Sequence, residues 1–277
     1  MKTYPLISVL VPAYNHEKYV GKTLNSIVED TYPNKELIII NDGSTDSTAQ
    51  IIDDWASKHK NEIRIKFENR ENGGVTKNLN SLIDLSIGEY ILFIHSDDYL
   101  LPDGIMKRYE YLQSHPEKLA VFADCFVIDK GNNKIHNSGL SDLYIADKNN
   151  FTDPERLKKE IINKWSVPGG TLMVKKEAYN QYSYNEGFIL EDLDFYLYFA
   201  SQDLIGFIDE AVSAYRVHGE NTCMKDENWI RVQKDIINSY KYNLKYYDFR
   251  FKLWMILKIL LNYRPLVNHA ISGKFRK

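Results

Sequence analysis

Two hydropathy patterns alternate along the first half of the chain. Apolar runs rich in β-branched residues predict buried strands at residues 6–14 and 35–42, and further strands are predicted at 63–69, 89–96 and 118–129. Between these runs, apolar side chains recur at helical spacing and predict helices at residues 16–30, 44–59, 73–86 and 102–115. Strands and helices that alternate in this way predict βαβ units, and therefore an α/β fold whose mostly parallel sheet carries helices on both faces.

The alternation stops near residue 129. Residues 130–150 are polar and turn-rich, which predicts a loop or a short hairpin. A helix at 153–164, a strand at 170–175, an acidic helix start at 190–202 and a strand at 205–218 follow. From residue 226 onward the chain is helical in pattern, aromatic and basic.

Composition narrows the class of protein. The chain has 277 residues, of which 44% are hydrophobic and 26% charged, as in a soluble globular protein with a substantial core. The net charge of -3 gives no reason to expect a nucleic acid partner. Cys125 and Cys223 form no CxxC motif, which favours structural thiols in a reducing cytosol. The N-terminal apolar run is broken by prolines and is interpreted as a strand rather than a signal peptide, and no stretch is long enough to predict a membrane-spanning helix.

Polar residues follow four of the predicted strands, in the segments "VPAYN", "NDGSTD", "ENRENGGVTKN" and "HSDD". Each segment alone is explained by turn chemistry or a helix entry. The carboxyl ends of parallel strands meet at one rim of a sheet, however, and this is where such folds bind ligands. Four polar strand ends together therefore predict a binding site at this rim.

The residue types at the rim indicate a nucleoside diphosphate. Asp42 can accept hydrogen bonds from a base or a ribose. Asn72, Lys77 and Asn78 lie near glycines and a helix start, where anions are favoured. The pair Asp97 and Asp98 offers oxygen ligands for Mg²⁺ or Mn²⁺, which readily share phosphate oxygens. The alternative is that the pair caps the following helix, although one carboxylate would suffice for a cap.

Several segments of the sequence together resemble a known family. The segments "SVLVPAYNHEKYVGKTLNSIVEDTYPNKELIIINDGSTDSTAQII", "NGGVTKNLN", "GEYILFIHSDDYLLPDGI", "EDLDF" and "YRVHGENT" occur in the order found in family 2 glycosyltransferases of the GT-A fold, across residues 6–222. The resemblance implies an inverting, metal-dependent transfer of a sugar, with a UDP-sugar as the expected donor. The implied acceptor is a glycan or lipid-linked saccharide, in bacterial surface polysaccharide synthesis at the inner face of the cell membrane.

The resemblance also implies a domain division and a set of site residues. The glycosyltransferase domain would span 1–222, with a nucleotide-sugar half at 1–129 and an acceptor half at 130–222, followed by an extension at 223–277. The implied metal ligands are Asp97, Asp98 and His218. His95 stands where the family usually has the first Asp of "DxD", and we expect it to tune nucleotide contact without abolishing metal binding. The residues expected at the nucleotide sugar are Pro12, Ala13, Tyr14, Asn15, Asp42, Asn72, Lys77, Asn78, His95, Ser96 and Asp97.

Two carboxylates compete for the role of catalytic base. Asp192 matches the position of the family's base, and Glu191 is its neighbour. An attacking hydroxyl must lose its proton, so the chemistry requires such a base. The alternative is that both acids merely favour the dipole of a helix start. By analogy, Trp165, Gly169 and Gly170 would line the acceptor side, although a plain turn explains the two glycines equally well.

The C-terminal segment leaves two interpretations open. Residues 240–277 mix aromatic and apolar side chains with lysine and arginine, so the helix can lie in a membrane interface or pack on the catalytic domain. Two other functions also remain. A sugar-phosphate nucleotidyltransferase would need a glycine-rich N-terminal loop, which "VPAYNHEKY" lacks. A non-catalytic relative gains some support from His95, while the intact Asp97 and Asp192 argue against it.

Overall fold

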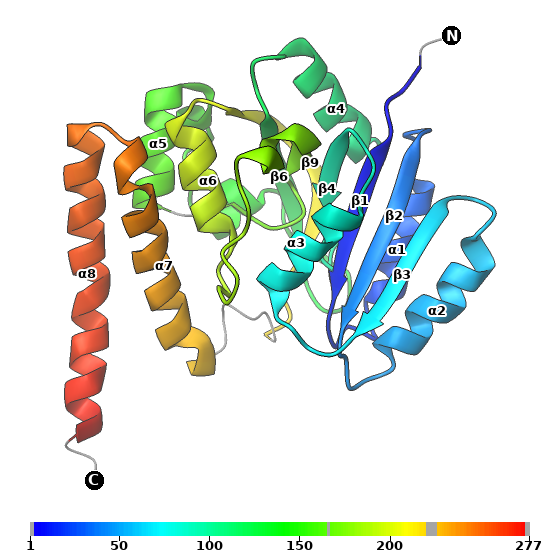
Figure 1. Cartoon of the computed structure of the whole chain (residues 1–277), viewed down its shortest axis with the longest axis horizontal. Coiled ribbons are helices and arrows are strands. Elements are labelled where there is room, and N and C mark those ends of the chain that lie inside the picture. The colour runs from blue at the N-terminus through cyan, green and yellow to red at the C-terminus, as the bar shows by residue number, and fades with distance from the viewer. Residues whose placement is uncertain (1–2, 165–166, 220–225, 275–277) are drawn as a thin grey trace.

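The computed structural model describes residues 3–164, 167–219 and 226–274. Within these ranges, one sheet of nine strands has the order β3-β2-β1-β4-β8-β6-β9-β5, with β7 paired to β6. Figure 1 shows β3, β2, β1 and β4 side by side in this order. The strands are β1 (Ile7–Ala13), β2 (Lys35–Asp42), β3 (Arg64–Arg70), β4 (Tyr90–Phe93), β5 (Tyr99–Leu100), β6 (Ala120–Ile128), β7 (Lys134–His136), β8 (Met173–Lys175) and β9 (Ile205–Arg216).

Helices cover both faces of this sheet. The α-helices are α1 (Val20–Glu29), α2 (Thr48–His59), α3 (Val75–Leu85), α4 (Gly104–Ser114), α5 (Pro154–Asn163), α6 (Asp192–Ser201), α7 (Trp229–Asn243) and α8 (Phe249–Lys274). Short helical turns are η1 (Gly139–Leu143), η2 (Lys148–Thr152), η3 (Lys176–Asn180), η5 (Asp226–Asn228) and η6 (Leu244–Tyr246). The predicted α/β class and the predicted alternation in the first half are confirmed.

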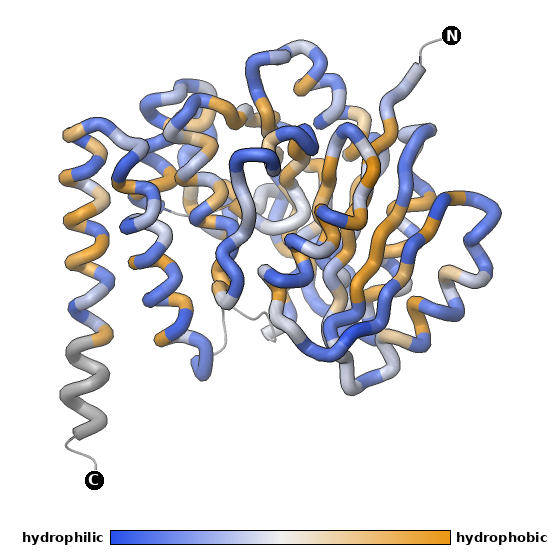
Figure 2. The backbone as a smooth tube through the Cα atoms, in the orientation of Figure 1, coloured by the Kyte–Doolittle hydropathy of each residue, from blue (hydrophilic) through white to orange (hydrophobic). Residues whose placement is uncertain are grey.

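Alternate residues of the central strands enter two separate cores. Leu10 and Ile38 belong to the core that α3 and α5 to α8 cover, whereas their neighbours Val9 and Leu37 belong to the core beneath α1, α2 and α4. Side chains alternate between the faces of a strand, so a strand buried on both faces must be apolar throughout. Figure 2 shows the resulting concentration of apolar positions along the strands. The two cores pack against the two faces of the sheet and so support the rim formed by the carboxyl ends of its strands.

The sheet is less uniformly parallel than a plain series of βαβ units. Strands β1 to β4 run parallel, but β8 pairs antiparallel with both β4 and β6. Val174 of β8 lies opposite Ile91 on one side and Ala120 on the other. The second half of the chain therefore inserts a strand into the sheet built by the first half, and the predicted hairpin at 130–150 contributes β7.

The first predicted helix starts later than its hydropathy pattern suggests. Residue Asn15 has a φ of 53°, and the amide of Tyr19 bonds the carbonyl of His16 at 2.9 Å, so residues 15–19 form a turn. Helix α1 begins only at Val20. This turn leaves His16 beside the strand ends instead of on a helix.

The C-terminal helices pack against the second half of the domain, at the side remote from β1 to β3 (Figure 1). The hydroxyl of Tyr240 donates to the carbonyl of Ile162, and that of Tyr247 to Leu197, both at 2.8 Å. No helix in the described ranges combines the length and apolar character that crossing a membrane requires. The division into 1–222 and 223–277 stays a prediction.

Candidate functional site

The loops that follow β1 and β2 are tied together at the rim. The amide of Asn15 donates to Ser44 Oγ at 2.9 Å, and Asn15 Oδ1 accepts from the amide of Thr45 at 2.8 Å. Pro12 and Ala13 lead into this turn at the end of β1, and Tyr14 is 46% exposed beside it. The first two polar strand ends therefore lie next to each other, as the sequence predicted.

Asp42 joins the end of β2 to the loop after β3. Its carboxylate accepts from the amides of Gly73 at 2.7 Å and Gly74 at 3.1 Å, and its carbonyl accepts from Asn72 Nδ2 at 3.0 Å. A carboxylate has about four acceptor positions, so these two bonds leave capacity for a ligand. Gly43 has a φ of 69°, and a Cβ there would lie 2.7 Å from the amide nitrogen of Asn72, so this turn requires glycine.

The two polar residues of α3 differ in exposure. Asn78 is buried and donates to the carbonyl of Gly74 at 3.1 Å, which fixes the first turn of the helix. Lys77 is exposed, and its aliphatic chain runs beside Gly73. Lys77 can therefore reach an anion at the helix start, whereas Asn78 supports the loop.

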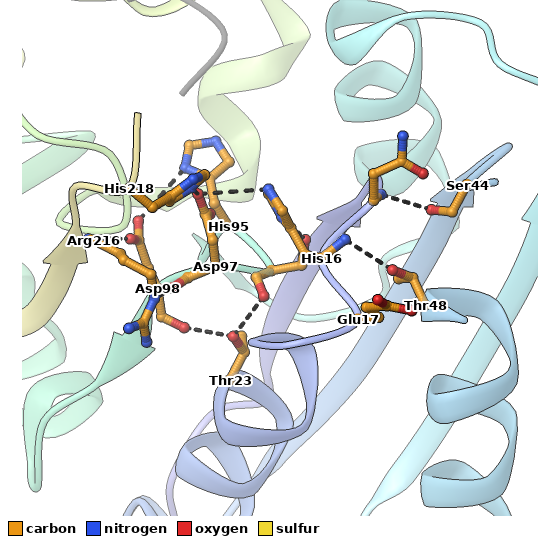
Figure 3. A network of polar contacts seen from close by, with 12 residues as sticks. His16, Glu17, Thr23, Ser44, Thr48, His95, Asp97, Asp98, Arg216 and His218 are labelled. Atoms are coloured by element: carbon orange, nitrogen blue, oxygen red, sulfur yellow. Dashed lines mark hydrogen bonds and ion pairs between the residues drawn. The ribbon is translucent and has the colours of Figure 1, made fainter. Parts of the chain in front are cut away.

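Asp97 lies among histidines (Figure 3). Its Oδ2 is 3.0 Å from His218 Nε2 and 3.7 Å from His16 Nε2. Burial opposes ionisation of this carboxyl, but the hydrogen bond to His218 and the nearby His16 outweigh burial and lower the pKa of Asp97 to about 2. Asp97 is therefore a carboxylate at neutral pH. Burial also lowers the pKa of His16.

Asp98 turns the other way, into the protein. Its Oδ1 accepts from the backbone amide of Arg216 on β9 at 2.8 Å, and its Oδ2 is buried without a hydrogen-bond partner among the residues that the structure describes. Burial, followed by the charge of Asp97, raises the pKa of Asp98 well above its usual range. The adjacent carboxyls therefore ionise unequally, which limits the repulsion between them.

Arg216 and Thr23 hold the "HSDD" segment in place. The guanidinium of Arg216 donates through Nε to the carbonyl of Asp97 at 2.6 Å and through Nη1 to the carbonyl of Asp129 at 2.9 Å. Thr23 Oγ1 on α1 bonds the carbonyls of Ser96 at 3.0 Å and Asp98 at 2.5 Å. The segment after β4 is therefore clamped between the first helix and the last strand (Figure 3).

His95 lies beside the segment that was predicted to face the acceptor. Its Nδ1 is 3.9 Å from Asp98 Oδ2, and burial lowers its pKa. A Cβ on Gly169 would come within 2.6 Å of that Nδ1, and a Cβ on Gly170 within 2.8 Å of Ile94 Cδ1. The close approach that these glycines permit is thus to His95 and Ile94, which follow β4. Trp165 lies outside the described residues.

Glu191 and Asp192 stand at the start of α6. The segment that leads to them docks on the first turn of α3, since Thr76 Oγ1 accepts from the amide of Gly187 at 3.0 Å. Burial and the charge of Asp192 raise the pKa of Glu191 to about 8, so Glu191 is protonated at neutral pH. Asp192 Oδ1 accepts from the amide of Leu193 at 2.9 Å.

The side chains present fit a divalent cation. Among the described residues, His16, Asp97 and His218 can each supply one ligand atom, and these atoms lie within 4.8 Å of one another. Asp97 and His218 were predicted as ligands, and His16 was not. The predicted ligand Asp98 is not in this group, and its role in metal binding stays a prediction. The position of His16 directly after a strand end was the available sign, but the helical spacing of residues 16–30 concealed it.

Comparison with known proteins identifies the family. Residues 8–183 match the family described as Glycosyl transferase family 2. This chain belongs to glycosyl transferase family 2. The family 2 chain is 26% identical over 243 residues to Glycosyltransferase GlyA of Streptococcus pneumoniae, an alignment that covers 84% of this chain and 34% of that protein. The chain thus spans about a third of the length of that relative.

Solved structures share the architecture of this family 2 chain. TarS of Staphylococcus aureus, residues 1–349 in complex with UDP-GlcNAc, superposes with a TM-score of 0.69 at 20% identity, covering 93% of this chain and 72% of that one. Mannosyltransferase PcManGT from Pyrobaculum calidifontis, in complex with GDP-Man and Mn²⁺, gives a TM-score of 0.66 at 17% identity, covering 94% and 70%. These likenesses confirm the GT-A fold.

Proposed function

We propose that the chain is an inverting, metal-dependent glycosyltransferase that moves a sugar from a nucleoside diphosphate to an acceptor hydroxyl. The observation that carries this proposal is the grouping of Asp97, His16 and His218 at the strand ends of a family 2 chain. At the same rim, the carboxylate of Asp42 accepts from the amide of Gly73 in the loop that precedes α3. The segment before Asp192 docks on the first turn of α3.

A nucleotide sugar suits this rim. The start of α3 presents a helix N-terminus and the exposed Lys77, which favour a diphosphate. Asp42 keeps acceptor capacity for a base or ribose. Relatives of the same fold were solved with UDP-GlcNAc and with GDP-Man and Mn²⁺, which supports this class of donor. We expect a UDP-sugar. A bound divalent cation would supply positive charge to the departing diphosphate, and Asp97 and His218 would hold it.

Protonation favours Asp192 over Glu191 as the base at α6. The base must be ionised to accept a proton from the acceptor hydroxyl. Glu191 is protonated at neutral pH, which leaves Asp192 as the better base. Asp192 removes the proton while the hydroxyl oxygen attacks the anomeric carbon on the face opposite the diphosphate. The bond between sugar and diphosphate breaks with inversion.

Transfer assays with paired variants test the proposal. The full chain would be incubated with UDP-, GDP- and dTDP-sugars, Mn²⁺ and saccharide acceptors, together with Asp192→Asn and Glu191→Gln. We expect Asp192→Asn to lose about 100-fold to 10,000-fold in turnover while it retains nucleotide-sugar binding. Glu191→Gln should keep most activity at pH 7 because it replaces a neutral acid. Wild type and Asp192→Asn that are equally inert with every donor would favour a non-catalytic relative.

The open face of α8 supports a membrane-linked acceptor. Leu253, Leu257 and Leu260 are 53%, 49% and 62% exposed, while Phe251 and Met255 on the opposite face are buried against the domain. Apolar residues recur along α8 (Figure 2), and some of them are buried while others are exposed, so packing and membrane contact are compatible. Arg250, Leu253, Trp254 and Leu257 line a shallow hollow on this face.

Charge favours an anionic lipid surface as the occupant of that face. No aspartate or glutamate occurs in residues 249–274, whereas Arg250, Lys252 and Arg264 carry positive charge. A second copy of the same helix would bring like charges together, but anionic headgroups would attract them. We therefore propose that the chain acts on a lipid-linked saccharide at the cytoplasmic face of the membrane.

Flotation with liposomes tests the membrane contact. Wild type should float with phosphatidylglycerol vesicles, and Leu257→Glu/Leu260→Glu should stay in the soluble fraction. A matched control is Ile87→Glu/Ile135→Glu, which changes two exposed isoleucines elsewhere and should float normally. Equal flotation of the α8 variant and the control would contradict the proposal.

A further inference from the structure

The sequence motifs assign no function to His16, yet its side chain lies with Asp97 and His218 in the group that could hold a metal ion. Its Nε2 is 3.7 Å from Asp97 Oδ2, and its ring meets the ring of His218 edge-on at a centroid distance of 5.7 Å. We propose that His16 is a direct ligand of the divalent cation and makes this site select transition metals over Mg²⁺. The inference rests on the proposed function, which supplies the reason for a cation here.

The distances suit an ion between the three side chains. Metal–nitrogen and metal–oxygen bonds of about 2.1 Å place neighbouring ligand atoms about 3.0 to 3.5 Å apart. Asp97 Oδ2 lies 3.0 Å from His218 Nε2 and 3.7 Å from His16 Nε2. The second distance is too long for a hydrogen bond but close to the separation of adjacent ligands. Small shifts of the imidazoles would complete the arrangement.

The other nitrogen of the imidazole has the partner that a ligating histidine needs. His16 Nδ1 is 2.7 Å from Ser96 Oγ, and Ser96 is buried. When Nδ1–H donates to that hydroxyl, the lone pair of Nε2 faces Asp97. Metal-binding histidines commonly donate their second N–H in this way, which fixes both ring orientation and tautomer.

The backbone of His16 is also fixed before any ion binds. Its amide donates to Thr48 Oγ1 at 2.8 Å, and the left-handed Asn15 before it turns the chain toward the rim. Figure 3 shows His16 and His218 approaching Asp97 from different segments of the chain. The ligand group is therefore assembled by tertiary structure, with little rearrangement left for the ion to drive.

The donor atoms decide which ions the site prefers. Two imidazole nitrogens and one carboxylate oxygen leave further coordination positions open to phosphate oxygens or water. Mg²⁺ demands oxygen ligands, whereas imidazole suits transition metals, whose affinity rises from Mn²⁺ to Co²⁺ in a site of given geometry. With His16 as ligand, the expected order is Co²⁺ above Mn²⁺ and both well above Mg²⁺. Without it, the remaining histidine would discriminate less.

Metal binding without transfer provides the test. Electron paramagnetic resonance would measure the affinity of the full chain for Mn²⁺, with and without UDP. Spin-echo modulation would count the imidazole nitrogens that coordinate the ion. Wild type should show two nitrogens, and His16→Ala should show one and bind Mn²⁺ at least about tenfold more weakly. His16→Asp should shift preference toward Mg²⁺. The control His59→Ala changes a histidine stacked on Trp55 and should match wild type.

The outcomes separate this inference from the proposed function. Equal Mn²⁺ affinity and an unchanged nitrogen count in His16→Ala would overturn the role of His16, even if the enzyme transfers sugar. A wild type with fewer than two coordinated nitrogens would also overturn it. Two nitrogens in wild type and one in His16→Ala, in a chain that transfers no sugar from any donor, would retain the ligand and refute the transferase.

Discussion

Replacing Glu191 by glutamine should stabilise the folded protein at alkaline pH and leave it unchanged in acid. Burial raises the pKa of Glu191 from its ordinary 4.5 to about 8, with the charge of Asp192 as the second cause. Its place at the start of α6 would by itself favour the ionised form, so burial outweighs the helix dipole. Holding a carboxylate there costs free energy that a neutral amide does not.

The sign follows from proton uptake. Between pH 4.5 and 8 the folded protein keeps a proton on Glu191 that the unfolded chain releases, so the free energy of unfolding falls as pH rises through this window. A shift of that size corresponds to at most about 5 kcal/mol. Glu191 is only partly buried, and solvent screening and its coupling to Asp192 reduce the expected effect to about 2 kcal/mol.

Urea denaturation at a series of pH values measures this effect. Wild type and Glu191→Gln would be compared at pH 4, 6.5 and 8.5. The variant should match wild type near pH 4 and exceed it by about 2 kcal/mol at pH 8.5. A difference that stays constant with pH, or a variant less stable at pH 8.5, would refute the assignment of a raised pKa.

Three further changes follow from the geometry. Asp97→Asn should weaken Mn²⁺ binding at least about 100-fold in isothermal titration, since it removes the carboxylate ligand, and unaltered affinity would argue against this site. Gly104→Ala should cost roughly 1–3 kcal/mol in urea unfolding, because its Cβ would lie 2.4 Å from the carbonyl of Val212, while the matched Gly21→Ala, with open space, should gain up to about 1 kcal/mol. His95→Asp should change UDP affinity while Mn²⁺ affinity without nucleotide changes less than about tenfold, and a gain in metal affinity by orders of magnitude would contradict this.

The first half of the fold was predictable because its signals are local. Strands β1, β2 and β4 are buried, the edge strand β3 has exposed and half-buried residues, and each intervening helix has an apolar face, so period and composition sufficed. Strand β8 was different. Its three residues were found as a strand, but nothing local shows that Val174 inserts antiparallel between Ile91 and Ala120. Pairing of that kind depends on contacts between distant segments.

The sequence predicted where the site lies but not which side chains contact one another there. The sequence located Asp97 and Asp98 at a strand end, but their opposite orientations depend on His218 and on the amide of Arg216, more than a hundred residues away. His16 was missed because only the folded turn separates it from α1. Residue types and motifs predicted a metal and nucleotide site, whereas tertiary contacts decide which of these side chains lie in it.

The clamp formed by Arg216 limits how this chain can be divided. Arg216 binds the carbonyl of Asp97, and His218, two residues further on, meets the carboxylate of the same aspartate. A fragment that ends before β9 would lose the clamp and a proposed ligand together. Grafting a new acceptor half onto residues 1–129 would therefore require the exchanged piece to carry its own matched β9. The two halves would therefore have to be exchanged together rather than separately.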